Sequence, residues 1–401
     1  DIGTITVTNS GGTTFSSTVS AATVAITSTT TGNAVSFSGN LTLTSGMTVG
    51  AGSAAYNVAI LGASNSVAGA TTFSNTGTVT LGDGSDALAF TGGLVATAPS
   101  RVYLGGTITA AGTGVLNIGA PVTVSYNSTV GGTSTGAITL GAATLADGVT
   151  LTVGTGIGNT LSLSSVTGTA GGSTSNLTIN TTGAVTVGAV GTDIGTITVT
   201  NSGGTTFSGA VSATTVTLTN TTGTIAFNDS LTATTLNTAA QAYNVSMVGS
   251  SNSITSATTF SNTGTVTLGV NAGTSLFAGG LVVTSPSALT IAGSISTNSA
   301  AVSLSASAKT VTLGGVDVVI STYADAGLGA AITISGAIEA SSAGIQSLEL
   351  KSKSGAISLV GNIGANTRIG TLRLGDANQT GAISLDGTFV VGSLVVGDSS
   401  A

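Results

Sequence analysis

The chain has 401 residues, of which 41% are hydrophobic but only 5% are charged and 3% are aromatic. A formal net charge of −7, with six basic residues in no continuous stripe, argues against binding a nucleic-acid backbone. Cysteine and histidine are absent, which removes disulfides, thiol chemistry and the commonest general acid–base group near neutral pH. No apolar run of roughly 18 residues or more predicts a membrane-spanning helix.

The composition favours many short β-strands joined by tight turns. Val, Ile and Thr prefer strands, and the 61 glycines, with Asn and Asp, suit the turns between them. Ile5 and Val7 alternate with Thr4, Thr6 and Thr8, which is the two-residue period of a half-buried strand. No stretch shows a helical apolar period with caps, so we predict almost no helix. In chain order, the predicted strands include residues 4–8, 23–27, 34–38, 40–44, 56–61, 78–82, 137–141, 149–153, 177–180 and 347–350.

The sequence also repeats itself over a long period. DIGTITVTNSGGTTFS at residues 1–16 returns unchanged at 193–208, an offset of 192. TTFSNTGTVTLG at 71–82 returns at 258–269, an offset of 187, so the second copy has lost five residues between Thr219 and Tyr243. RIGTLRLGD at 368–376 resembles the start of the repeat. We therefore predict one continuous rod made of a long repeat unit at 1–192, a second at 193–368 and the start of a third at 369–401.

Two all-β architectures compete for this pattern. Tandem immunoglobulin-like sandwiches need about 100 residues each and large core side chains, which this chain lacks. A β-solenoid needs only a narrow core of stacked Val, Ile, Leu and Ala, with each coil covering the previous one. Coils of roughly 20 residues are expected, and a turn could absorb a deletion of five residues. We therefore predict an all-β, elongated parallel β-solenoid.

The cadence of GTITVTNSGGTTFSGAVSATTVTLTNTTGTIAF at 195–227 resembles the large strand-repeat surface proteins of bacteria, which are related in style to filamentous haemagglutinin. The resemblance is one of composition and rhythm, and it covers essentially the whole chain. It implies a secreted, right-handed parallel β-helix that serves as an adhesin or a surface fibre. The secretion domain that such proteins often carry at the N-terminus is not recognisable in the sequence.

Ionisable residues do not gather into an obvious site. A polysaccharide-cleaving β-helix would need clustered carboxylates, or carboxylates with a metal and an arginine. We therefore predict no catalytic, cofactor-binding or metal-binding residue, and no enzymatic activity. The scattered acidic residues are Asp83, Asp86, Asp147, Asp229, Asp317, Asp325, Glu339, Glu349, Asp376, Asp386 and Asp398.

Two other features invite a binding role. GDGSD at 82–86 places Asp83 and Asp86 in a calcium-loop-like turn, but it lacks EF-hand spacing, and its counterpart at 269–274 has no carboxylate. An ordinary turn is therefore favoured, with calcium binding left open. Thr-x-Thr pairs could order water on an ice-binding face, but β-propensity alone readily explains them. Their spacing varies, and Ala25 stands where its counterpart is Thr217, so the ice-binding interpretation is disfavoured. The candidates are Thr4/Thr6/Thr8, Thr42/Thr44, Thr107/Thr109 and Thr215/Thr217/Thr219.

The sequence thus predicts a non-enzymatic structural protein of the bacterial cell surface: an extracellular fibre, sheath or adhesin stalk. The alternative is a carbohydrate-binding or polysaccharide-cleaving β-helix protein. An open solenoid end exposes unpaired strand groups, and neither end of this sequence has a polar cap. We expect each end to pair with further repeats of a longer chain or head-to-tail with identical subunits, giving a filament. Surface glycans are possible partners, at sequons such as Asn40, Asn127, Asn176, Asn180, Asn220, Asn228, Asn244 and Asn378.

Overall fold

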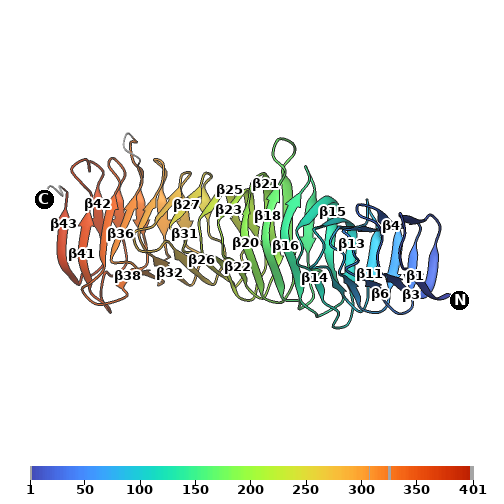
Figure 1. Cartoon of the computed structure of the whole chain (residues 1–401). Helices are drawn as coiled ribbons and strands as arrows, with labels where there is room; N and C mark the ends of the chain where they lie inside the picture. Colours follow the sequence, from blue (N-terminus) through green and yellow to red (C-terminus); the bar gives the residue numbers. More distant parts are fainter. Residues whose placement is uncertain (1, 307, 324–326, 398–401) are drawn as a thin grey trace. The chain divides into compact units, whose positions relative to one another are not determined.

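The computed structural model describes residues 2–306, 308–323 and 327–397. Every regular element in the described residues is a β-strand (Figure 1). The chain divides into two compact units, Asp1–Thr205 and Thr206–Ala401. Each unit is a parallel β-solenoid, and the described residues make about 18 turns in all. Among those residues, no helix is long and apolar enough to cross a membrane.

The first unit contains 21 complete strands, and β22 (Thr205–Phe207) lies at the division between the units. The strands are β1 (Ile2–Val7), β2 (Thr13–Phe15), β3 (Val19–Ile26), β4 (Ala34–Phe37), β5 (Leu41–Leu43), β6 (Met47–Val49), β7 (Asn57–Ile60), β8 (Ser64–Val67), β9 (Thr71–Phe73), β10 (Thr78–Leu81), β11 (Ala87–Phe90), β12 (Leu94–Val95), β13 (Arg101–Ala110), β14 (Leu116–Ile118), β15 (Val122–Gly132), β16 (Ile138–Leu145), β17 (Thr150–Val153), β18 (Leu161–Gly168), β19 (Ser175–Asn180), β20 (Val185–Gly191) and β21 (Ile194–Asn201).

The described part of the second unit contains the remaining strands. They are β23 (Val211–Leu218), β24 (Thr224–Phe227), β25 (Leu231–Thr238), β26 (Asn244–Met247), β27 (Ser251–Ile254), β28 (Thr258–Thr259), β29 (Thr265–Leu268), β30 (Thr274–Phe277), β31 (Leu281–Val283), β32 (Ala288–Ile291), β33 (Ser294–Ser296), β34 (Val302–Leu304), β35 (Thr310–Leu313), β36 (Asp317–Ser321), β37 (Ile332–Ile334), β38 (Ala337–Ala340), β39 (Ser347–Lys351), β40 (Ile357–Leu359), β41 (Ile369–Leu374), β42 (Ile383–Leu385) and β43 (Val391–Val396).

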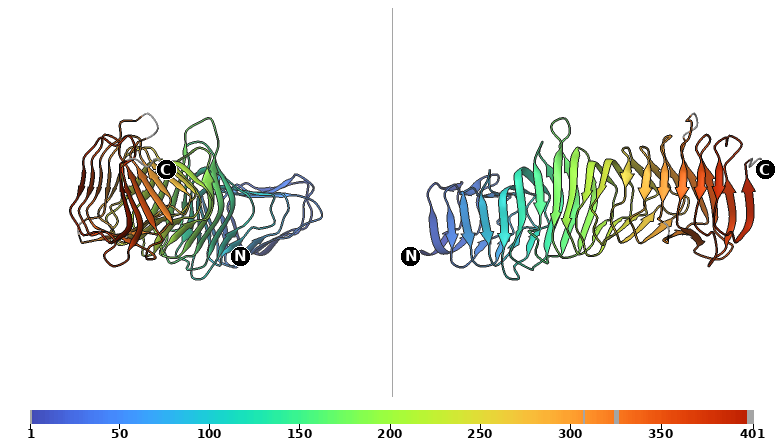
Figure 2. Two further views of the ribbon diagram at one scale, coloured as in Figure 1. Left: turned by 90° about the vertical axis from the view of Figure 1, so that its left-hand side faces the viewer. Right: turned by 180° about the vertical axis from the view of Figure 1, so that it is seen from behind.

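The core of the first unit is built from columns of stacked aliphatic side chains. Strands of successive turns stack in parallel (Figure 2). Their register places each inward residue beside its counterpart one turn earlier. Burying one such side chain contributes roughly 1.5–3 kcal/mol, and β-branched residues suit the extended backbone. Alternation of inward apolar and outward polar residues therefore sets the register of each turn. One column contains Val35, Val58, Val79, Val102 and Val122, each no more than 1% exposed.

The second unit repeats this construction. Its strands β24, β26, β29, β32 and β35 pair in parallel and stack their inward residues. A separate six-stranded parallel sheet, β28-β31-β34-β37-β40-β42, belongs to the same unit. Column residues lie 20 to 23 positions apart here, close to the predicted coil length. The column on the first five strands contains Ile225, Val245, Val266, Leu289 and Val311, each no more than 2% exposed.

The shorter second copy keeps the stacking of the strands on either side of its deletion. Phe37 pairs with Ile60 in the first copy, and Phe227 pairs with Met247 at the same place in the second. Between these strands, the first copy has β5 and β6 with a break, whereas the second has the single strand β25. The offset between the copies is 192 at Ile26 and Leu218, 190 at Phe37 and Phe227, and 187 at Ile60 and Met247, so the five residues are lost from more than one connection rather than from a single turn.

Each copy of the repeat has a buried tyrosine at the corresponding position. Tyr56 and Tyr243, from the repeated sequence AYNV, are each 0% exposed. The Tyr56 hydroxyl donates to the Gly50 carbonyl oxygen at 2.5 Å, and the Tyr243 hydroxyl donates to the Leu218 carbonyl oxygen at 2.9 Å. Burial raises the pKa of Tyr56 to about 12 and that of Tyr243 to about 12. Both side chains are therefore held in their neutral form inside the core.

These tyrosines predict a loss of stability in alkali. Below about pH 10 the hydroxyls are neutral in both the folded and unfolded states, so their contribution is complete. Between about pH 10 and 12 only the unfolded state ionises, which costs up to ~1.4 kcal/mol per pH unit for each tyrosine. We expect the double variant Tyr56→Phe/Tyr243→Phe to lose less stability than the unchanged chain between pH 9 and pH 11 in urea titrations. Equal losses in the two proteins would contradict this assignment.

Candidate functional site: a charged groove on the second unit

A groove with charged side chains lies on the outer face of the second unit, across β36, β39 and β41. The parallel register places Asp317, Ser347 and Thr371 in one row of outward residues. Glu349 and Arg373 occupy the next row, two positions further along each strand. The groove encloses a cavity of about 220 Å³, lined by Asp317, Val318, Val319, Ser347, Leu348, Glu349, Thr371 and Arg373.

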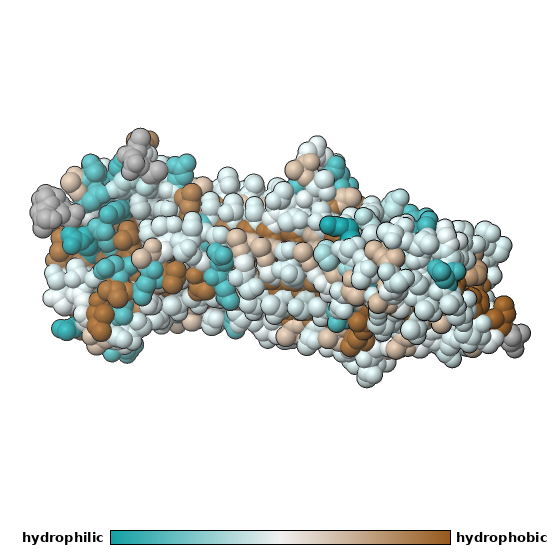
Figure 3. Space-filling view, viewed as in Figure 1, coloured by the Kyte–Doolittle hydropathy of each residue, from teal (hydrophilic) through white to brown (hydrophobic). Residues whose placement is uncertain are grey.

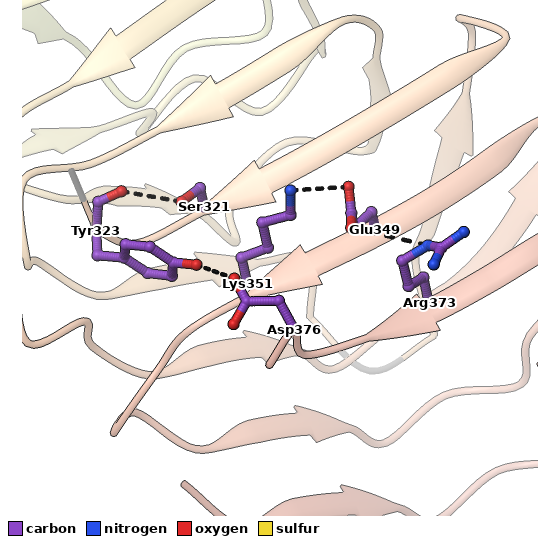
Figure 4. Close-up of polar contacts among 6 residues, drawn as sticks. All are labelled: Ser321, Tyr323, Glu349, Lys351, Arg373 and Asp376. Atoms are coloured by element: carbon purple, nitrogen blue, oxygen red, sulfur yellow. Dashed lines mark hydrogen bonds and ion pairs between the residues drawn. The ribbon is translucent and has the colours of Figure 1, made fainter. Parts of the chain in front are cut away.

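Glu349 of the groove forms ion pairs with Arg373 and with the neighbouring Lys351 (Figure 4). Glu349 Oε2 lies 3.1 Å from Lys351 Nζ, and Glu349 Oε1 lies 3.7 Å from Arg373 Nε. These side chains are between 21% and 33% exposed, so water screens the attraction and each pair contributes at most about 1 kcal/mol. The pairs therefore orient the groove residues more than they stabilise the fold.

A second polar group, Tyr323 with Asp376, lies beside Lys351 (Figure 4). The Tyr323 hydroxyl donates a hydrogen bond to the Asp376 carboxylate, and Lys353 Nζ lies 4.3 Å from the centre of the tyrosine ring. Burial, followed by the Asp376 carboxylate, raises the pKa of Tyr323. Burial opposes ionisation of Asp376, but hydrogen bonds from Tyr323 and Asn378 and the nearby lysines lower its pKa overall. The tyrosine is thus a neutral donor beside a carboxylate.

The groove combines three kinds of polar group at one place. The carboxylates of Asp317 and Glu349 accept hydrogen bonds, the Arg373 guanidinium donates them, and the Ser347 and Thr371 hydroxyls do both. Such a set is complementary to a polyhydroxylated ligand. Both Glu349 oxygens already contact a cation, which makes this carboxylate a poor base or nucleophile. The described residues contain no group of three or more His, Cys, Asp or Glu side chains that could hold a metal ion.

A side-chain hydrogen bond closes the Asp83–Asp86 turn. Asp86 Oδ2 accepts a hydrogen bond of 2.8 Å from the Asp83 backbone N–H, which closes the turn between β10 and β11. Burial and the neighbouring Asp86 carboxylate raise the pKa of the Asp83 carboxyl. Gly82, with φ of +79°, supplies the left-handed backbone that this turn needs. The geometry is that of a side-chain-capped turn, as the sequence favoured.

The remaining acidic residues do not join the groove. Glu339 is 7% exposed and accepts hydrogen bonds from the backbone N–H groups of Asn366 and Thr367, so it holds a connection. Asp147, Asp229 and Asp386 are exposed and lie on other connections. Asp325 and Asp398 lie outside the described residues.

The threonine pairs do not form a continuous double ladder. Outward threonines stack in one column over five strands, at Thr107, Thr129, Thr152, Thr178 and Thr198, but the adjacent column is broken where Thr109 pairs with Gly131. Thr4 pairs with Thr23 and their hydroxyl oxygens lie 2.8 Å apart, but the next outward residue, Thr6, pairs with Ala25. The parallel neighbour of Thr42 is Ser66. A long ladder in register, as an ice-binding face requires, is interrupted at these positions.

The hydrophilic side chains of the second unit gather over the region that contains the groove (Figure 3). Sequence reasoning did not find this site, because Asp317 and Glu349 lie 32 positions apart and Glu349 and Arg373 lie 24 positions apart. A usable signal was present: charged residues replace Thr or Ser at outward positions of successive coils.

Comparisons with protein-family models, with curated proteins and with solved structures found no match. The parallel β-solenoid is consistent with strand-repeat proteins and compatible with structural or adhesin roles. A functional assignment therefore has to be argued from the chain's own geometry.

Proposed function

We propose that the chain is a non-enzymatic structural protein of the bacterial cell surface, which forms an extracellular fibre, sheath or adhesin stalk. The observation that supports this best is the continuous stacking of inward residues from turn to turn in both units. In such an architecture each turn is stabilised by its neighbours, so length can be added by copying coils. The unchanged sixteen-residue repeat is what copying of this kind leaves in a sequence.

Electron microscopy of the native cell surface, with antibodies against this chain, tests the proposal. Labelling along thin fibres or a sheath is the expected result, and intact cells should lose the label after protease treatment. Labelling confined to the cell interior would overturn the surface assignment. Labelling of scattered globular particles would instead overturn the fibre, sheath or stalk form.

The charged groove on β36, β39 and β41 favours a second function, namely binding of a surface saccharide. We expect the unchanged chain to bind at least one oligosaccharide in a glycan panel. The variant Arg373→Ala should bind it at least about tenfold more weakly, since a charged hydrogen-bond donor is lost. Arg101→Ala is the matched control, because Arg101 lies on β13 of the first unit and donates to Thr123 Oγ1 there. An equal effect of the two substitutions would contradict a binding role for the groove.

A further inference from the structure

The groove across β36, β39 and β41 contains polar side chains that have no partner among the described residues. None of those residues forms a hydrogen bond or an ion pair with the Asp317 carboxylate or with the hydroxyls of Ser347 and Thr371. Arg373 Nε lies 3.7 Å from Glu349 Oε1, which is longer than a hydrogen bond. The two terminal nitrogens of Arg373 form no hydrogen bond with a described residue, so their donors are available to a ligand.

The β41 side of the groove carries an excess of positive charge. Glu349 supplies one negative charge against the two positive charges of Lys351 and Arg373, which lie on either side of it (Figure 4). Lys353 and Asp376, which lie next to this group, add one charge of each sign and leave the balance unchanged. An anionic ligand group is therefore favoured at Arg373.

The opposite side of the groove carries a single negative charge. Asp317 is exposed on β36, whereas Arg373 is on β41, and β39 lies between these two strands. Two strand spacings of about 4.8 Å and one two-residue step of about 6.6 Å place the Cα atoms of Asp317 and Arg373 roughly 12 Å apart. Two linked sugar rings have about this length, so one disaccharide could reach both charges.

Each side of the groove also presents a group that suits a sugar ring. Val319 is half-buried on the same face as Asp317, two positions further along β36, where its methyl groups could contact the C–H groups of a ring. Thr371 has the same relation to Arg373 on β41, and Ser347 lies between Asp317 and Thr371 in the register of the strands. Their hydroxyls can donate to and accept from ring hydroxyls.

We propose that the groove binds a zwitterionic saccharide, with an amino sugar over β36 and a uronic acid over β41. Asp317 accepts hydrogen bonds from the protonated amino group, and the Arg373 guanidinium donates to the carboxylate. A neutral saccharide would leave both charged side chains without a partner in a partly dehydrated groove, which lowers affinity. The inference rests on the proposed binding of a saccharide by this groove and specifies the class of saccharide.

Calorimetric titration with a matched set of four disaccharides tests this assignment. The probes are glucosamine linked to glucuronic acid, its N-acetylated form, its carboxyl-reduced form and the form that carries both changes. At about pH 6 the free amino group is protonated and the carboxyl group is ionised. We expect the zwitterion to bind at least about tenfold more tightly than either singly changed form, since each change removes one charge-assisted hydrogen bond.

Charge-removing variants assign each ligand group to one residue. Asp317→Asn should bind the free-amine and N-acetylated forms with equal affinity but keep its preference for the carboxylate. Arg373→Gln should lose the preference for the carboxylate and keep that for the amino group. Both side chains lie on the outer face, so both variants should fold. The matched controls Asp147→Asn and Arg101→Gln, in the first unit, should leave both preferences unchanged.

The inference and the saccharide-binding function fail in different ways. If the doubly changed disaccharide binds as tightly as the zwitterion, and Arg373→Gln weakens its binding, the groove binds saccharides but the zwitterionic class is wrong. An equal loss of affinity for all four disaccharides in Asp317→Asn would also overturn the assignment of the amino group to Asp317. If neither these disaccharides nor any member of the glycan panel binds, the saccharide-binding function fails together with the inference.

Discussion

Replacing Phe227 by alanine is expected to lower the free energy of unfolding of the second unit by about 3–5 kcal/mol. The ring is 0% exposed and stacks on Phe207, with centroids 4.9 Å apart and planes inclined by 3°. It also lies beside Met247 of the next turn. A narrow solenoid core has few other side chains that could move into the cavity, so the upper part of this range is expected.

Denaturant unfolding combined with hydrogen exchange measures this effect. Turns are stabilised mainly by their neighbours. In the variant, the backbone amides of β24 and β26 should therefore exchange faster, while those of distant strands should keep their exchange rates. Phe389→Ala is the matched control: this ring is 39% exposed, and its removal should cost no more than about 1 kcal/mol. Similar losses from the two substitutions would argue against the stacked core described above.

Replacing Glu339 by alanine is expected to cost about 3 kcal/mol. This nearly buried carboxylate accepts hydrogen bonds from Asn366 N–H at 3.2 Å, from Asn366 Nδ2 at 3.1 Å and from Thr367 N–H at 2.6 Å. Its removal leaves two backbone donors without their partner, and hydrogen bonds to a charged group are worth about 1.5–3 kcal/mol.

The measurement is urea unfolding of the variant, with hydrogen exchange read at residues 364–368. We expect Glu339→Gln to lie between the alanine variant and the unchanged chain, since the amide keeps one acceptor oxygen. Glu349→Ala serves as the control, because its ion pairs are partly exposed and should contribute less than about 1 kcal/mol. A larger loss from Glu349→Ala than from Glu339→Ala would refute this ranking.

The fold was predictable because backbone periodicity and side-chain size determine it. Residues such as Ile5 and Val7 alternate with threonines, and every segment predicted as a strand overlaps an observed strand. The absence of Trp and Cys left only a narrow core, which favoured stacked coils over sandwiches. The lengths of individual coils could not be predicted as well from the sequence, because turns and connections such as residues 327–331 have no sequence period.

The charged groove was not predictable for a different reason. Asp317, Glu349 and Arg373 become neighbours only when the register between coils is known, and coil lengths vary in this part of the chain. Buried polar residues were missed as well. Asn65 and Asn252 lie inward on their strands, where they accept from the backbone N–H groups of Leu41 and Leu231. Their recurrence in the repeated segment SNS was the available signal.

The parallel pairing of successive turns also has a mechanical consequence. Hydrogen bonds between turns run along the direction of stacking. A pulling force in that direction therefore acts on the hydrogen bonds of every interface between turns. The weakest interface opens first, while the remaining turns keep their own neighbours. Each coil released in this way, about 21 residues such as Val58 to Val79, can extend by roughly 70 Å. Each unit is therefore expected to yield stepwise under tension and to dissipate energy before the chain is fully drawn out.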